Sequence, residues 1–329
     1  MGFASRPCSE LTPAWRTGIW NLAGSLSPHE VACSRTACEV HGMTTSGRGI
    51  IREARRPPGW VAPGPAPAGA QGRPELEPEA DEDLCFLTGD WRLFQKQRGH
   101  RWSLDDLVTA WIATRRQDPD RALRALDLGC GLGSVLLMVA WKLPHAEVLG
   151  IEAQADRAAM GRRSIAYNGV EDRCRILDGD LRDADTTHLG TAPFELITGT
   201  PPYFPRGTGT ESDKPHAMPC RFEVRGGVED YLEAASRVLA PGGEITVCTS
   251  ALERDRVTFA LRELGLHSRE HWDIVPREGK DVLVMVDVVT AAPTDATTHT
   301  LVVRDRASVW TPEFQLVRTA MGIPAAPPR

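Results

Sequence analysis

The chain has 329 residues, of which 41% are hydrophobic and 25% charged, and its formal net charge is −6. These values are typical of a soluble globular protein with one large domain or two small ones. They exclude a membrane-spanning helix, since no run of about 18 apolar residues occurs, and they give no overall attraction to nucleic acid, so an RNA contact would need a local basic patch.

Residues 1–83 are expected to form a disordered leader and linker. The first 75 residues contain eight arginines, five acidic residues and no lysine, and seven of the 22 residues from Pro57 to Pro78 are proline. Such a segment buries too little apolar surface to offset the entropy lost on folding. An arginine- and serine-rich, acid-poor start is also typical of an organellar transit peptide, so organellar import is an alternative to the cytoplasmic location that we expect.

Between residues 84 and 292, apolar strand-like runs alternate with helical stretches. The expected strands are Arg124–Leu128, Glu147–Ile151, Cys174–Leu177, Glu195–Thr198, Glu244–Cys248 and Asp281–Val289. The expected helices are Ser134–Lys142, Gln154–Tyr167, Val228–Leu239 and Glu253–Leu264. This alternation predicts an α/β domain over 84–292 with a Rossmann-like, doubly wound, seven-stranded sheet and helices on both faces. Residues 293–329 are expected to be an extension, partly helical around Thr311–Met321 or disordered.

The clearest local motif is a strand that runs directly into three glycines, Gly129, Gly131 and Gly133, before a helix begins. Glycine is needed where a side chain would block the approach of the backbone to a bound cofactor. A dinucleotide fingerprint would place glycine or alanine at position 134, which is Ser134. Asp127, two residues before the first glycine, suits a cationic ligand better than a pyrophosphate. The pattern therefore favours S-adenosylmethionine over NAD.

Two further acids are expected in the same site. Glu152 ends the second strand, 19 residues past Gly133, where a carboxylate can accept hydrogen bonds from both ribose hydroxyls of an adenosine cofactor. Asp180, followed by Leu181, comes just after the third strand, where it could receive an adenine amino group. Each acid alone could be a solvated loop carboxylate, but together with Asp127 they follow three successive strands beside the glycine loop. We therefore predict a nucleoside-cofactor site.

With these motifs, residues from about Gly89 to Val289 resemble a class I S-adenosylmethionine-dependent methyltransferase. The fourth strand ends in Thr200-Pro201-Pro202-Tyr203-Phe204, which is similar to the Asn/Asp-Pro-Pro-Tyr/Phe motif of amino-group methyltransferases. The segment Phe94–Asp106 and the run Cys220–Glu223 resemble the tRNA (adenine-N6)-methyltransferase branch. The resemblance implies that Gln95 and Ser103 lie at the cofactor.

The Thr200–Tyr203 segment is the expected catalytic edge. Pro201 and Pro202 would fix a carbonyl that accepts hydrogens from the target amine, and Tyr203 would offer a face on which a flat base stacks. A base within folded RNA would have to be swung out to reach it. Thr200 departs from the family pattern, because its hydroxyl oxygen is one carbon shorter than the Asn or Asp oxygen. A proline turn that merely closes the strand remains the alternative.

The loop after this edge is the expected place of substrate contact, through Phe204, Arg206 and Arg221. We expect an N-methyltransferase acting on adenine in tRNA or another RNA. A protein glutamine amide or a small-molecule amine is the alternative substrate, and a catalytically silent cofactor-binding partner is the alternative class. A monomer or a homodimer, without a membrane partner, is expected. No metal is predicted, since none of the eight cysteines forms a CxxC pair.

Overall fold

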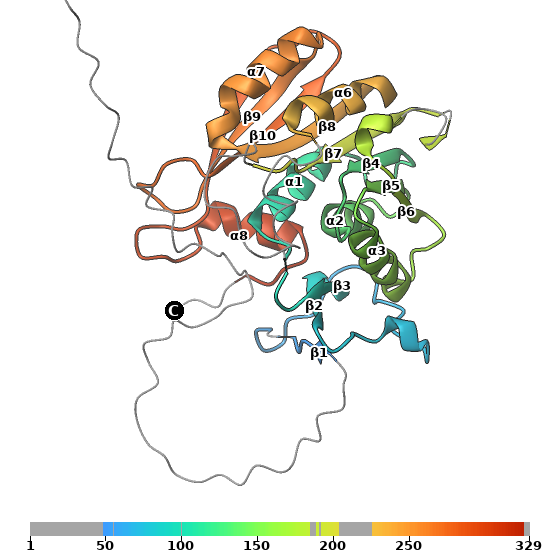
Figure 1. Ribbon diagram of the computed structural model, residues 1–329. Coiled ribbons are helices and arrows are strands. Elements are labelled where there is room, and N and C mark those ends of the chain that lie inside the picture. The colour runs from blue at the N-terminus through green and yellow to red at the C-terminus, as the bar shows by residue number, and fades with distance from the viewer. Residues whose placement is uncertain are drawn as a thin grey trace, which may run out of the picture. The chain divides into compact units, whose positions relative to one another are not determined.

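The computed structural model describes residues 49–54, 56–99, 101–184, 189–190, 192–203 and 226–325, and every structural statement below refers to these. Within them the main feature is an eight-stranded sheet in the order β11-β9-β10-β8-β7-β4-β5-β6 (Figure 1). Its strands are β4 (Arg124–Leu128), β5 (Glu147–Glu152), β6 (Cys174–Asp178), β7 (Phe194–Gly199), β8 (Leu239–Ser250), β9 (His267–Val275), β10 (Val284–Thr290) and β11 (Thr297–Val302).

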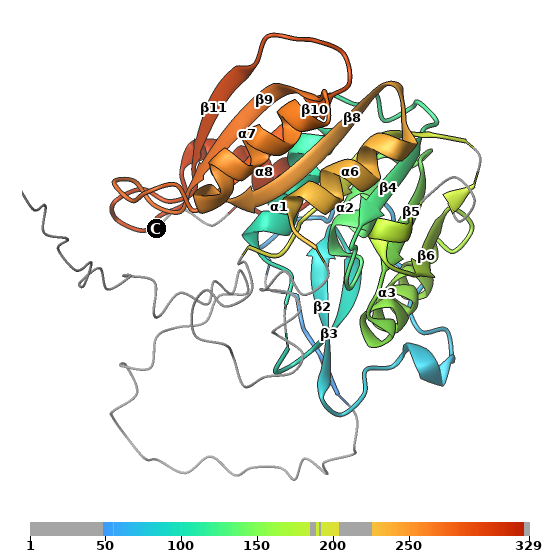
Figure 2. The same ribbon diagram turned by 45° about the horizontal axis from the view of Figure 1, so that its top comes forward.

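The helices are α1 (Leu104–Thr114), α2 (Ser134–Lys142), α3 (Ala155–Asn168), α6 (Val228–Val238), α7 (Arg254–Glu263) and α8 (Pro312–Ala320), with single 3₁₀ turns η2 (Leu181–Asp183) and η3 (Ala251–Glu253). Helices α6 and α7 pack together over one face of the sheet, while α1, α2 and α3 belong to the other (Figures 1 and 2). The predicted α/β class and the doubly wound arrangement are therefore confirmed.

The order of the parallel strands creates a switch point. From β4 the chain proceeds outward through β5 to β6, and it then returns to place β7 on the other side of β4, again parallel. In a sheet of this kind, the connections on the two sides of β4 leave in opposite directions and open a crevice at the carboxyl ends of the strands. The strand register aligns the carboxyl ends of β4, β5 and β7, since Leu128 lies opposite both Ile151 and Gly199.

The predicted strand count of seven was too low by one. β11 pairs in parallel with β9 and adds an eighth strand at the edge. It lies in the stretch 293–329, which was expected to be helical or disordered, although α8 does appear close to the predicted helix Thr311–Met321. Leu301 is the one buried residue of β11, so the sequence of this strand lacks a clear apolar period. Its order comes from pairing with β9, which is a long-range effect that local pattern does not report.

A second, three-stranded sheet precedes the large one. It is formed by β1 (Ile50–Ile51), β2 (Glu82–Thr88) and β3 (Trp91–Lys96), with β1 beside β2 and β2 beside β3. The intervening chain contains the 3₁₀ turn η1 (Pro74–Leu76) and contacts α3, where Arg163 donates to the Glu77 carbonyl at 2.7 Å.

This region corrects the expected boundary at residue 83. Residues 49–83 were assigned to a disordered linker, yet Leu76 is 1% exposed and the Gly69 amide donates to the Tyr167 carbonyl at 2.9 Å. The proline-rich composition misled the prediction because prolines that cannot join a sheet can still pack as fixed turns on a neighbouring helix. Residues 1–48 lie outside the described residues.

Trp141, near the end of α2, is a point where distant segments meet. A Cβ atom added to Gly64, Gly89 or Gly322 would lie 2.4, 3.0 or 2.8 Å from the indole ring, so glycine is what allows each backbone to approach it. The Gly89 amide also donates to the Gly322 carbonyl at 3.1 Å. The connection between β1 and β2, the β2–β3 turn and the end of α8 are thereby joined around one side chain.

Candidate active site

A pocket opens at the switch point, at the carboxyl ends of β4, β5, β6 and β7. The space between its walls, counted together with the open solvent at its mouth, is about 860 Å³. The lining residues are Trp102, Asp106, Gly129, Cys130, Leu132, Ser134, Ile151, Glu152, Ala153, Gln154, Arg157, Gly179, Asp180, Leu181, Thr200, Pro202, Gly226 and Tyr231. The pocket thus brings together residues that follow four successive parallel strands.

The glycine loop forms the floor of this pocket. Gly129, Gly131 and Gly133 all have positive φ angles, of 59°, 56° and 79°, which side-chain-bearing residues rarely adopt. A Cβ atom on Gly129 would lie 2.2 Å from the Tyr231 hydroxyl oxygen, so the backbone there can only be glycine unless the tyrosine ring moves. Of the three glycines, Gly129 lines the pocket, whereas Gly131 and Gly133 do not.

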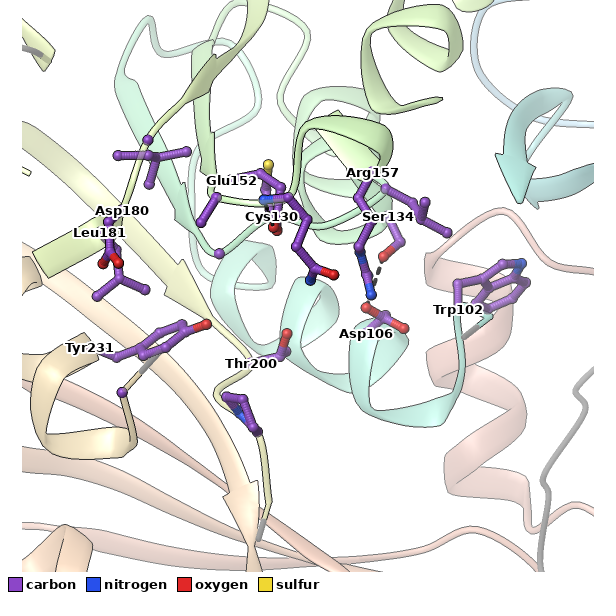
Figure 3. A pocket seen from close by; sticks show the side chains of 18 residues that line it. Trp102, Asp106, Cys130, Ser134, Glu152, Arg157, Asp180, Leu181, Thr200 and Tyr231 are labelled. Atoms are coloured by element: carbon purple, nitrogen blue, oxygen red, sulfur yellow. Dashed lines mark hydrogen bonds between the residues drawn. The ribbon is translucent and has the colours of Figure 1, made fainter. Parts of the chain in front are cut away.

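Glu152 lies at the centre of the pocket, as Figure 3 shows, and it is 6% exposed. One of its carboxylate oxygens accepts from the Gly131 amide at 2.8 Å, and the other accepts from the Gln154 amide at 2.7 Å. The carboxylate therefore fixes the glycine loop against the end of β5. Each oxygen retains a second lone pair, so these contacts leave acceptor capacity for hydroxyl groups of a ligand.

Asp127 lies beneath the loop and does not line the pocket. It is 3% exposed and accepts from the Leu136 amide at 3.1 Å and from the Thr198 hydroxyl at 2.8 Å. Leu136 is in the first turn of α2, where backbone amides have no partner within the helix, and Gly133 at the helix start has no side chain to supply one. Asp127 is therefore placed to cap α2. Burial raises the pKa of this carboxyl to about 7.

At the β6 side, Asp180 and Leu181 both line the pocket. Asp180 is also bound by Arg182, whose backbone amide, Nε and Nη2 donate to it at 3.0, 2.9 and 2.6 Å. The carboxylate is thus held in place by its own turn, η2, while Leu181, 7% exposed, supplies an apolar surface beside it. A flat apolar ring with a polar edge would fit this end.

Asp106 and Ser134 meet at the opposite end of the pocket (Figure 3). The Ser134 hydroxyl donates to Asp106 at 2.8 Å, and the Ser103 amide donates to the second oxygen at 2.8 Å. Burial, followed by the charge of Asp105, raises the pKa of Asp106 to about 7. Asp106 ends the segment Phe94–Asp106 that resembles the tRNA (adenine-N6)-methyltransferase branch, but it was not among the expected site residues.

The expected catalytic edge borders the same pocket. Thr200 and Pro202 line it, and Pro201 is buried between them. Tyr203, which is half-buried, is not a lining residue, because its hydroxyl extends to α1 and donates to Asp105 at 2.6 Å. The carboxyl end of β7 therefore presents two of the four predicted catalytic residues to the pocket.

Two of the expected cofactor residues lie elsewhere. Gln95 is 1% exposed in β3, where its amide nitrogen donates to Asp83 and to Cys85 Sγ, each at 3.0 Å. Ser103 is the N-cap residue of α1 and hydrogen-bonds Asp105. Their positions correct the expectation from the resemblance, since both side chains serve the packing of nearby elements. Phe204, Arg206 and Arg221 lie outside the described residues.

Sequence reasoning also missed several lining residues. Trp102 and Arg157 close one end of the pocket, and Tyr231, from α6, lies below it beside Thr200 (Figure 3). Tyr231 lies about thirty positions after β7 in the sequence. It reaches the pocket only because α6 packs back against the carboxyl end of the sheet. The signal that could have found Trp102 and Asp106 is that both belong to the segment Phe94–Asp106, which carries the resemblance to the tRNA branch.

Two further properties concern the described residues only. Among them, no group of three or more His, Cys, Asp or Glu side chains is arranged to hold a metal ion. No helix in the described part of the chain has both the length and the apolar character needed to cross a bilayer.

The sheet order and a pocket at its switch point define the class I methyltransferase fold. A solved structure described as a predicted O-methyltransferase from Agrobacterium tumefaciens has this fold, with a TM-score of 0.52, 22% identity, and coverage of 68% of this chain and 99% of that one. Residues 106–263 match the family model of the methyltransferase small domain. The match spans a little under half of the chain, and a family of this kind uses S-adenosylmethionine as the methyl donor.

Two named relatives resemble the chain in sequence. A tRNA1(Val) (adenine(37)-N6)-methyltransferase from Porphyromonas gingivalis is 32% identical over 165 residues, which is 49% of this chain and 60% of the relative. A release factor glutamine methyltransferase from Caulobacter vibrioides is 35% identical over 151 residues, 44% of this chain and 51% of the relative. The chain thus spans less than two thirds of either relative, and their substrates differ.

Proposed function

We propose that this chain transfers a methyl group from S-adenosylmethionine to an amino nitrogen, and that this nitrogen is the exocyclic amine of an adenine in tRNA or another RNA. The observation that carries the proposal is that Thr200 and Pro202, at the carboxyl end of β7, line the same pocket as Glu152 and the glycine loop. A methyl donor bound on the loop and an amine held at the β7 edge would therefore meet in one space.

The pocket fits the nucleoside part of the donor. Gly129 leaves backbone surface where a Cβ atom would collide with Tyr231. Glu152 offers acceptor lone pairs for ribose hydroxyls, and Asp180 with Leu181 offers a polar edge beside an apolar surface for the base. When bound, S-adenosylmethionine supplies a methyl group activated by a sulfonium.

The β7 edge would prepare the acceptor nitrogen. The lone pair of an aromatic amine is delocalised into the ring, so acceptors for its hydrogens are needed to concentrate electron density on the nitrogen. A proline-flanked carbonyl is rigid, and the Thr200 hydroxyl can accept one hydrogen bond. Displacement also requires the nitrogen to lie in line with the methyl group, which a fixed edge favours.

The adenine target is favoured by the name of the Porphyromonas relative, whereas the Caulobacter relative supports a second candidate, a glutamine amide in a protein. Both substrates present a planar group with an NH₂, so the β7 edge alone fits either. Thr200, which replaces the usual Asn or Asp, leaves room for a third outcome, a partner subunit that binds the donor without transferring its methyl group.

The test is incubation of the full chain with S-adenosylmethionine carrying a radiolabelled methyl group, together with total RNA and, separately, with a protein extract. We expect label in RNA that nucleoside analysis identifies as N6-methyladenosine. Label in protein would replace the proposal by the glutamine candidate. Binding of the donor by calorimetry without transfer to either mixture would indicate the silent partner. Gly129→Ala is the negative control: it should not bind the methyl donor, so no label should be transferred.

A further inference from the structure

Tyr203 is held at both ends. At the backbone end it follows Pro201 and Pro202, whose φ angles are fixed by their rings. At the other end its hydroxyl donates to Asp105 Oδ2 at 2.6 Å, and Cys248 Sγ lies 3.7 Å from the same hydroxyl. The 98 positions between Tyr203 and Asp105 show that the contact is made by the fold and not by neighbouring chain.

Asp105 is itself held firmly. Its second oxygen accepts from the Ser103 hydroxyl, and its backbone carbonyl accepts from the Thr109 hydroxyl at 2.7 Å. The first turn of α1 is closed by the Ser103 amide, which donates to Asp106 at 2.8 Å. Asp106, the next residue, lines the pocket. One turn of α1 therefore borders the cofactor pocket and anchors the tyrosine of the β7 edge.

We infer that Asp105 is a positioning residue that fixes the ring of Tyr203 before the substrate arrives. The inference rests on the proposed function and on the expectation from the sequence that this ring is the face on which the target base stacks. A free tyrosine ring would lose side-chain freedom when a base binds, and that loss weakens binding. A ring already anchored through its hydroxyl avoids the loss and keeps one orientation relative to Thr200 and Pro202.

The electrostatics agree with this role. Burial, and then the negative charge of Asp105, raises the pKa of Tyr203 well above its ordinary value. The phenol therefore keeps its proton over the working pH range and remains the donor in the contact. A hydrogen bond from a neutral donor to a carboxylate is also stronger than one between neutral groups.

The first test observes the contact without any substrate. The chain has three tyrosines, so tyrosine labelled with ¹³C at Cζ gives three NMR signals, and the one that is lost in Tyr203→Phe belongs to Tyr203. We expect Asp105→Ala to shift this signal, and Asp105→Asn, which keeps an acceptor oxygen, to shift it less. Thr114→Val is the matched control and should leave the signal in place, since the Thr114 hydroxyl, in the same helix, binds the Ala110 carbonyl at 2.7 Å and not Asp105. An unmoved signal in Asp105→Ala would overturn the inference.

The second test asks whether the contact serves the substrate. We expect Asp105→Ala and Tyr203→Phe each to lower kcat/KM by about tenfold, mainly through KM, while the Kd for S-adenosylmethionine stays within about twofold. The double variant should lose no more than either single one, because both remove the same bond. Asp105→Asn should recover most of the activity.

The outcomes separate the two claims. If the unaltered chain methylates protein and not RNA, the proposed function fails, and the same variants are then compared on the protein substrate. Losses in the two single variants that multiply in the double variant would reject the positioning role, whatever the substrate. A merely structural role for Asp105 predicts a weaker donor affinity and a lower Tm in step with the loss of activity, and that result would also reject it.

Discussion

Two groups of buried acids, at opposite ends of the central strands, differ in their partners. At the carboxyl ends, Asp106, Asp127 and Glu152 accept hydrogen bonds from backbone amides and hydroxyl groups. At the amino end of β8 and along β9, Glu244 and Glu270 accept from arginines. Glu244 binds Arg116 at 2.8 Å and Arg269 at 2.9 Å, and Glu270 binds Arg115 and Arg116.

The pKa directions follow from these partners. Burial alone raises the pKa of a carboxyl, and it does so at Asp106 and Asp127, to about 7 in each case. Burial also acts on Glu270, but the hydrogen bonds from Trp272 and Arg115 outweigh it and lower the pKa of that carboxyl. The comparison indicates that the acids of the β8–β9 end stabilise the fold as ion pairs, whereas those near the pocket hold the glycine loop and the start of α2 in place.

The largest effect is expected from the floor of the pocket. Gly129→Ala places a methyl group 2.2 Å from the Tyr231 hydroxyl oxygen at a positive φ, and we expect S-adenosylmethionine binding to weaken by more than about 100-fold. Gly265→Ala is the matched control, since Gly265 has a φ of 63° and open space around its Cβ position. Calorimetry should show unchanged affinity in the control, and equal losses in both would mean that backbone strain alone is responsible.

The next effect separates the two acid regions directly. Glu152→Gln leaves only one acceptor oxygen for the Gly131 and Gln154 amides, so we expect donor affinity to fall by roughly tenfold with little change in Tm. Glu270→Gln should do the reverse, lowering Tm by roughly 2–8 °C with unchanged donor affinity. Thermal unfolding and calorimetry on both variants check this. If both variants changed the same quantity, the division between the regions would be wrong.

A smaller effect concerns pH. Because the pKa of Asp127 is raised in the folded state, the folded chain holds a proton that the unfolded chain releases, and stability falls as pH rises from about 4 to about 7. Asp127→Asn removes this titration and should flatten the fall. Glu270 has the opposite sign, since its lowered pKa gives stability that is lost as pH falls. Urea unfolding between pH 4 and 8 measures both, and a slope unchanged in Asp127→Asn would contradict the burial argument.

The smallest change is expected at the β7 edge. Thr200→Asn restores the longer carboxamide acceptor at a residue that lines the pocket, and adenine methylation should continue at the present rate or rise by up to about tenfold. Nucleoside analysis after timed incubation measures it, with Thr200→Val as the partner variant that removes the acceptor. A complete loss in Thr200→Asn would show that the pocket is built for another amine.

Sequence alone located the elements around the glycine loop closely. The predicted strand Arg124–Leu128 and helix Ser134–Lys142 agree with β4 and α2 to the residue, because apolar strand, glycine turn and helix follow one another without interruption. β9 was not predicted. Its sequence mixes charged residues with apolar ones, and Glu270 is paired with Arg115 and Arg116, which directly follow α1 more than 150 positions earlier.

The site was predictable in part for the same reason. Gly129, Glu152, Asp180 and Thr200 each follow a strand, and parallel strands bring their carboxyl ends together. The position of Asp127 was not foreseeable, because whether a carboxylate faces a ligand or caps the next helix depends on which side of β4 it occupies. The hydrogen bond from Tyr203 to Asp105 could not be predicted either, because it forms only when α1 packs across the sheet.

The indole of Trp141 sets a lower limit on the piece of this chain that can fold by itself. Shortening the chain to the region 106–263 that matches the family model would delete Gly64, Gly89 and Gly322 together, and the ring would then face water on three sides. An autonomous fragment must therefore extend well upstream and downstream of the catalytic region. A fragment cut to the matched region would lack all three segments that pack on this indole.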